Sequence, residues 1–232
     1  MDEPPTTECV SPRGRGALRA RALRLWLSVR TIAALCLLGY VGRADEPLRI
    51  PIVFHVAEVR GQSEAVAPAS FLTEQLAAAN TIYRPLGIEL VVLERVPLAA
   101  RHARLITRAD RDALAPYVRK GEIHCFVVAK LMDVDEPGRE RRGVHWHARS
   151  VPGRSFLIVS KISRPYVLAH ELGHMFGHRE HSDVPGNLMS YKRTDQPPFL
   201  DATQAQRVQR TLADLVKMGV LVPLANHRTA TP

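Results

Sequence analysis

Apolar and β-branched residues gather in short runs along this 232-residue chain, and proline, glycine or polar residues bound each run. Runs of this length that are rich in Val, Ile and Phe are typical of strands that cross a buried core. The pattern predicts four main strands and a shorter one just upstream of the last. The main strands are expected at 48–59, 88–96, 123–131 and 156–162, and the short strand within 141–147.

Other segments carry apolar residues at helical spacing and predict helices. Thr107-Arg-Ala-Asp110 resembles a capping box and should open a short helix. Ser163 is expected to cap the helix that follows the last strand, with Pro165 in its first turn. The predicted helices cover 68–84, 107–121, a segment from Ser163 to the vicinity of Gly177, and 201–219.

The third of these helices contains the sequence His170-Glu-Leu-Gly-His174. Residues four apart stand on the same face of a helix, so His170 and His174 can each direct one imidazole nitrogen to a common metal ion. Glu171 lies next around the helix, close enough to take a proton from a metal-bound water. Three neutral nitrogen ligands and one water form the open tetrahedral arrangement of catalytic zinc. The motif predicts a zinc hydrolase site; the alternative is an exposed amphipathic helix without chemistry.

The continuation of this motif resembles the metzincin clan of zinc endopeptidases, whose pattern is H-E-x-x-H-x-x-G-x-x-H followed by a Met-turn. Gly177 stands where the clan has its glycine, at a turn that needs positive φ. Met189-Ser-Tyr191 resembles the Met-turn of the astacin and serralysin branches. By this resemblance Met189 is structural, beneath the metal, and Tyr191 is a candidate fifth ligand or oxyanion donor. The alternative for Tyr191 is a half-buried packing role.

The match slips by one residue at the third metal ligand. Where the clan has its third histidine this chain has Glu180, and His181 comes one step later. His178 follows the turn residue directly and has little chain with which to swing back. Glu180 keeps the clan's register counted from the helix, and His181 keeps it counted from Met189. We favour His181, because neutral imidazole is the usual ligand.

The resemblance covers about residues 48–219 and implies an α/β, metzincin-like catalytic domain with a twisted mixed sheet above a helix-lined cleft. It implies a zinc metalloendopeptidase with one catalytic Zn²⁺ ion, in which Glu171 is the general base. The expected metal ligands are His170, His174 and His181. The Met-turn favours a protease over a zinc amidase that acts on cell-wall peptide. The presence of the glutamate argues against a catalytically degenerate metal-binding module.

The segment Arg141-Arg-Gly-Val-His-Trp-His147 is where the metzincin arrangement places an edge strand that pairs with an extended protein or peptide substrate. His145 and His147 share a face of this strand and could hold a second metal ion, although a place in the cleft or on the surface suits them better. Trp146 points to the other face and is expected to anchor packing.

The first 44 residues have the features of a signal peptide. Five arginines between positions 13 and 24 precede a short apolar run, 31–41, and 42–44 offers small residues to a signal peptidase. The run is short for a membrane span, so we expect cleavage near Ala44 and export to the periplasm or the medium, without stable membrane association afterwards. An uncleaved anchor through 25–41 is the alternative.

The charge of the chain bears on its partners, and its cysteine content bears on how the fold is stabilised. The formal net charge is +9, but residues after position 44 carry 25 basic against 20 acidic side chains. They show no block of Lys and Arg interleaved with aromatic residues, so nucleic acid is not expected as a partner. Cys125 is the only cysteine outside the leader and is expected to be inert core. We expect one monomeric domain over 45–222 and a flexible tail over 223–232.

Overall fold

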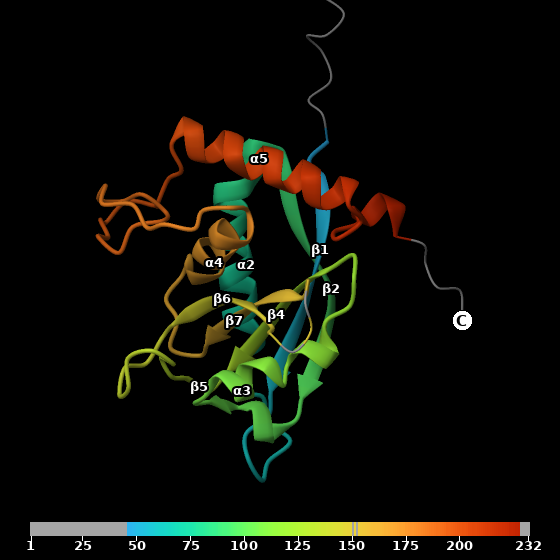
Figure 1. The fold of residues 1–232 in the computed structure, drawn as a ribbon, viewed down its shortest axis with the longest axis vertical. Coiled ribbons are helices and arrows are strands. Elements are labelled where there is room, and N and C mark those ends of the chain that lie inside the picture. Colours follow the sequence, from blue (N-terminus) through green and yellow to red (C-terminus); the bar gives the residue numbers. More distant parts are fainter. Residues whose placement is uncertain (1–45, 150, 152, 228–232) are drawn as a thin grey trace, which may run out of the picture. The chain divides into compact units, whose positions relative to one another are not determined.

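The computed structural model describes residues 46–149, 151 and 153–227 (Figure 1). The predicted leader, 1–44, and residues 228–232 of the predicted tail lie outside the described residues. The beginning of that tail contains a 3₁₀ turn, Leu224–Asn226 (η4). In the described part of the chain, no helix is both long and apolar enough to cross a membrane.

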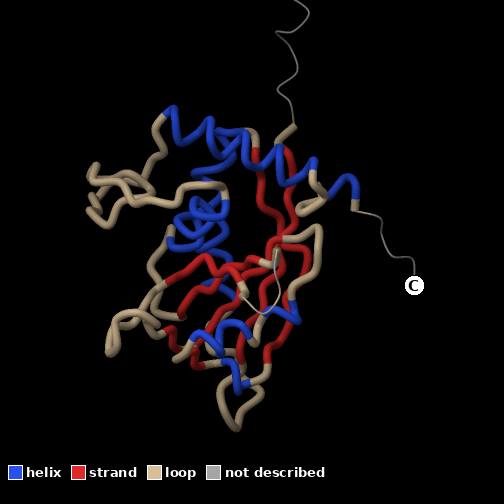
Figure 2. Tube along the Cα trace, viewed as in Figure 1, coloured by secondary structure: helices blue, strands red, loops and turns tan. Residues whose placement is uncertain are grey.

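A five-stranded sheet runs through the centre of the described domain (Figure 2). Its strands lie in the order β2-β1-β4-β7-β6, and β2, β1, β4 and β7 run parallel to one another. β6 closes one edge and pairs antiparallel with β7. The bounds are Leu48–Ala57 (β1), Ile88–Leu98 (β2), Ile123–Val128 (β4), Gly143–His147 (β6) and Ser155–Ser160 (β7). The predicted strands are therefore present, in a mostly parallel sheet.

The strand predicted at 123–131 is divided in two. β4 ends at Val128, and Lys130–Leu131 (β5) pairs with Arg104–Leu105 (β3) in a separate two-stranded sheet. The backbone N–H groups of Ala129 and Lys130 both donate to the carbonyl of Ala103, at 2.8 and 3.0 Å. These hydrogen bonds move the chain from the main sheet to the small one, a change that a continuous apolar run does not reveal.

The helices are Ala69–Tyr83 (α2), Arg108–Asp112 (α3), Val167–Met175 (α4) and Ala202–Lys217 (α5). Thr107 caps α3 in the predicted capping box with Asp110. The prediction that this helix continues to residue 121 is wrong: it ends at Asp112, and the chain forms a 3₁₀ turn at Ala115–Tyr117 (η3). Pro116 has no N–H to donate to a continuing helix.

The predicted start of α4 is also wrong. α4 begins at Val167, and its N-cap is Tyr166, which has a φ of 70° in the left-handed region. The hydroxyl of Ser163 donates instead to the carbonyl of Arg142, at 2.5 Å. Gly177, which follows α4, has the predicted positive φ, 97°.

Alternate residues of the strands pack into two cores, one on each face of the sheet. α2, α4 and α5 cover the larger core, to which α5 contributes Val208 and Leu212. Trp146 packs in the smaller core on the other face, as predicted, and its indole N–H donates to Asp112 Oδ1 at 2.7 Å. Cys125 is 1% exposed within the larger core, and burial raises the pKa of its thiol, which fits an inert core residue.

Candidate metal centre

The first and second histidines of the motif lie on α4, and the chain that follows Gly177 returns a third. One nitrogen of each of His170, His174 and His181 lies within 4.8 Å of the others. The ring centroids of His170 and His174 are 4.8 Å apart, and His181 lies 5.3 and 5.0 Å from them. Across the residues that the structure describes, no other group of three or more His, Cys, Asp or Glu side chains is close enough to share a metal ion.

Backbone carbonyls fix the two helical histidines. His170 Nδ1 lies 2.8 Å from the carbonyl of Leu188, and His174 Nδ1 lies 2.5 Å from the carbonyl of His178. A carbonyl can only accept, so each Nδ1 carries the proton and donates it. The Nε2 lone pair of each ring is then available to a metal, which is the usual support of histidine ligands.

The protonation of the three rings also suits a metal. Burial lowers the pKa of His170 to about 4, against a smaller opposing effect of its hydrogen bond to Leu188. Burial also lowers the pKa values of His174 and His181. All three are neutral at pH 7, as metal binding requires. Three neutral imidazoles around one point fit a zinc ion that keeps an open position.

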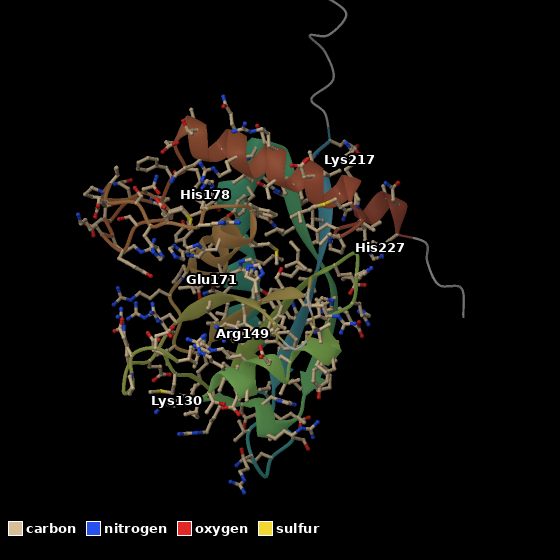
Figure 3. The ribbon with its side chains drawn as sticks, in the orientation of Figure 1. Lys130, Arg149, Glu171, His178, Lys217 and His227 are labelled. Carbon is tan, nitrogen blue, oxygen red and sulfur yellow. The ribbon has the colours of Figure 1, made fainter. Side chains whose placement is uncertain are left out.

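Glu171 lies on α4, is 5% exposed, and directs its carboxyl group toward Gly143 of β6 (Figure 3). Burial raises the pKa of this carboxyl to about 8; the backbone N–H of His145 and the charge of Arg141 act in the opposite direction. At pH 7 a carboxyl group with this pKa is largely protonated before a metal binds. The positive charge of a metal ion held by the histidines would favour the carboxylate, which can then accept a proton.

Gly143, the first residue of β6, makes room for this glutamate. A Cβ atom at Gly143 would lie 2.6 Å from Oε1 of Glu171 and 2.6 Å from Cγ1 of Val167. No larger residue fits without displacing one of them. Sequence analysis missed this role, although a glycine inside a strand pattern is a known sign of close approach by another group.

The loop after the motif packs Met189 against α4. Met189 is fully buried, and a Cβ atom at Gly173 would overlap its sulfur. Asn187 Oδ1 accepts from the backbone N–H of Met189 at 2.9 Å, and Asn187 Nδ2 donates to Gln204 Oε1 at 2.7 Å. Gln204 is also the third residue of α5 and part of its capping box. The Asn187–Gln204 contact was not predicted.

Tyr191 lies beside the third histidine. Its ring stacks on His181 with the centroids 4.3 Å apart, and it lies 6.0 Å from the ring of His170. Tyr191 is 60% exposed, so it is not the half-buried packing residue of the alternative interpretation.

The three histidines, Glu171 and Tyr191 line a cleft of about 1410 Å³ together with β6 and the segment after Tyr191. His145 and His147 lie on its β6 side, with ring centroids 4.4 Å apart. The buried Nε2 of His145 has no hydrogen-bond partner in the described chain. No third ligand joins this pair among the described residues. His178 is buried outside the group of three, and Glu180 is exposed outside it.

Comparison with known proteins shows which solved structures have a similar fold. No family model and no curated protein matches the sequence. Among solved structures, the chain is similar to the crystal structure of metalloproteinase-II from Bacteroides fragilis, with a TM-score of 0.50 and 18% sequence identity. The match covers 73% of this chain and 54% of that one, so this chain spans about half the length of its structural neighbour. At this identity the likeness concerns the fold: a mixed α/β domain similar to part of a metalloproteinase, with three histidines that could hold a metal ion.

Proposed function

We propose that this chain is an exported, zinc-dependent metalloendopeptidase of the metzincin type. The observation that carries the proposal is the convergence of His170, His174 and His181 on one point, with Glu171 buried beside them. The fold-level likeness to a metalloproteinase supports it. The export part rests on the sequence of residues 1–44, and mass spectrometry of the N-terminus of exported protein would test cleavage near Ala44.

The three histidines would hold the zinc ion, which supplies a Lewis acid that lowers the pKa of water and polarises the scissile carbonyl. Glu171 accepts the proton of the attacking water and delivers it to the leaving amine nitrogen. The hydroxyl of Tyr191, whose ring lies against His181, donates to the substrate oxygen on which negative charge develops. The free edge of β6 pairs with the extended substrate through backbone hydrogen bonds.

Replacing the general base tests this mechanism. In Glu171→Gln the size and the histidines are retained but the proton acceptor is lost, so zinc should stay near one ion per chain while peptide turnover falls at least about a hundredfold. Metal analysis and a casein or peptide-library digest with and without a chelator measure the two quantities. Glu74→Gln, at an exposed position of α2, is the matched control and should keep full turnover.

Two results would count against the proposal. Full activity of Glu171→Gln would remove the glutamate from the mechanism. Cleavage of cell-wall peptides with no cleavage of casein or peptide libraries would assign the site to a zinc amidase instead.

A further inference from the structure

Several arginine side chains line the cleft around the three histidines, and more than half of them have no partner among the described residues. Three of them are engaged: Arg141 pairs with Asp133 at 2.6 Å, Arg139 with Glu136 at 2.5 Å, and Arg111 donates to the carbonyl of Met132 at 2.6 Å. The guanidinium groups of the other four make no ion pair or hydrogen bond with any described residue. These four are Arg142, Arg164, Arg179 and Arg193.

Acidic residues of the cleft do not offset this excess. Asp133 and Asp135 are paired with Arg141 and Arg108. Glu140, Glu171 and Asp195 also line the cleft and have no ion-pair partner within the described ranges, which leaves three unpaired acids against four unpaired arginines. A cleft with a surplus of one sign of charge attracts ligands of the opposite sign.

Arg142 and Arg193 are the members of this set that lie nearest to the proposed chemistry. Arg142 directly precedes Gly143, which touches Glu171. Arg193 follows two residues after Tyr191, whose ring stacks on His181. Both side chains line the same cleft, and partial burial lowers the pKa of Arg193, with the charge of Arg142 lowering it further. Two neighbouring cations from different segments, without a counter-ion, are an arrangement that an anion stabilises.

We propose that Arg142 and Arg193 form a subsite that binds a carboxylate of the peptide substrate, either an acidic side chain or a free C-terminus. Guanidinium groups present paired N–H donors in a plane, which match the two oxygens of a carboxylate. The proposal rests on the proposed function and adds the chemical class of the preferred substrate.

The test compares matched peptides with the zinc-loaded full chain. One series scans a single Glu through the positions around the cleaved bond of an amidated peptide, a second replaces that Glu with Gln, and a third keeps Gln but frees the C-terminus. The quantities are kcat/KM for cleavage and Kd for binding to zinc-loaded Glu171→Gln, measured by calorimetry. We expect a peptide with one carboxylate near the subsite to be favoured about tenfold over its neutral partner in both, and less so at high salt.

The variants assign the preference to the two arginines. In Arg142→Gln/Arg193→Gln the ratio between the charged and neutral peptides should fall to about one. Arg210→Gln, at an exposed position of α5 outside the cleft lining, should keep the tenfold ratio. A preference confined to the free C-terminus would identify the chain end as the ligand, and a preference for internal Glu would identify the side chain.

Measuring both binding and cleavage distinguishes the proposed carboxylate subsite from the proposed peptidase function. Equal kcat/KM and Kd values for charged and neutral peptides would overturn the subsite and leave the protease in place. A tenfold ratio that survives in the double variant would also overturn it. A tenfold binding preference without cleavage of any peptide would support the subsite and overturn the proposed function.

Discussion

Gly143 and Gly173 shape the site because neither has a side chain. Gly143 leaves room for the carboxylate of Glu171, and Gly173 leaves room for the sulfur of Met189. Both lie within secondary structure, where glycine costs about 0.5–1 kcal/mol relative to alanine. The cost in stability at these two positions is offset by the close contacts that they allow, one with Glu171 and one with Met189.

Gly143→Ala should therefore separate catalysis from metal binding. The added methyl group meets Glu171 Oε1 at 2.6 Å, so the carboxylate has to move, while the three histidines lie on other segments. We expect zinc content near one ion per chain and a fall in kcat of at least about tenfold, because a displaced base is poorly oriented. Metal analysis, peptide cleavage and the thermal unfolding midpoint are measured together. Unchanged kcat in a folded, zinc-loaded variant would show that the glutamate is not positioned by this contact.

The choice of third ligand is also a single-residue question. His181→Ala should lose zinc affinity by at least about a hundredfold, because one of three nitrogen donors is removed. Glu180→Ala is the neighbouring control and should bind zinc normally, since this side chain lies outside the group of three. Competition with a coloured chelator measures both affinities. Weak zinc binding by Glu180→Ala with normal binding by His181→Ala would reverse the assignment.

Between elements, α5 and the Met189 loop are joined by one side-chain pair. Asn187 is 1% exposed, and its side-chain amide bonds to both elements. Its oxygen accepts from the backbone N–H of Met189, and its nitrogen donates to Gln204. α5 thus supports the segment whose Leu188 carbonyl orients His170. A helix that is remote from the motif in sequence thus helps to position a histidine of the candidate metal site.

Asn187→Ala should loosen this joint. Loss of the buried amide leaves partners on the loop and on α5 without their hydrogen bonds, which costs about 2–4 kcal/mol of folding free energy. Zinc affinity should fall as well, because Leu188 follows directly. Gln206→Ala, at an exposed position of α5, is the control. Denaturant unfolding and zinc titration are the measurements; a variant as stable as the control would show that the joint contributes little.

Local patterns explain which elements could be predicted. Apolar runs located the strands, and the four-residue spacing of His170 and His174 placed them on one helical face. The start of α4 could not be predicted, because the partner of Ser163 is the carbonyl of Arg142, 21 positions away. The contact of Asn187 with Gln204 likewise depends on tertiary packing. The capping box at Thr107 and the spacing of the two histidines could be predicted from neighbouring residues, whereas these contacts with distant partners could not.

At the scale of the whole molecule, sheet order was not predicted, since it depends on pairing between distant segments. β1 lies between β2 and β4, and this pairing brings His55 next to His124 on the buried face. His55 Nε2 lies 2.9 Å from His124 Nδ1, and the backbone N–H of Arg119 donates to His124 Nε2 at 3.0 Å. Because Nε2 of His124 accepts, its Nδ1 carries the proton and donates to His55.

This pair should make the fold sensitive to acid. Burial lowers the pKa of His55 to about 4 and that of His124 to about 3. Well above pH 6.5 both rings are neutral in the folded and the unfolded chain, so they add no pH dependence there. Below pH 6.5 these histidines bind protons in the unfolded chain but not in the folded one. The free energy of unfolding should therefore fall by about 2 kcal/mol per ring between pH 6.5 and 4.5.

His55→Phe isolates one of the two rings, because a phenyl group can keep the stacking of His55 on Phe126, where the centroids are 4.5 Å apart. The variant should lose about 2 kcal/mol of the acid dependence over the same interval. Denaturant unfolding at a series of pH values gives the two curves. Parallel curves for the variant and the parent chain would mean that His55 does not titrate on unfolding.

The antiparallel strand at the sheet edge has a consequence for solubility. β6 pairs with β7 on one side, and no strand of the described chain pairs with it on the other. A second copy of the chain could add there as readily as a peptide, and sheet edges avoid such self-association by placing charged residues beside them. Arg141 and Arg142 precede β6 and Arg149 follows it, so two copies that approach edge to edge bring like charges together. Salt screens that repulsion, and the chain should therefore become more prone to precipitate as ionic strength rises.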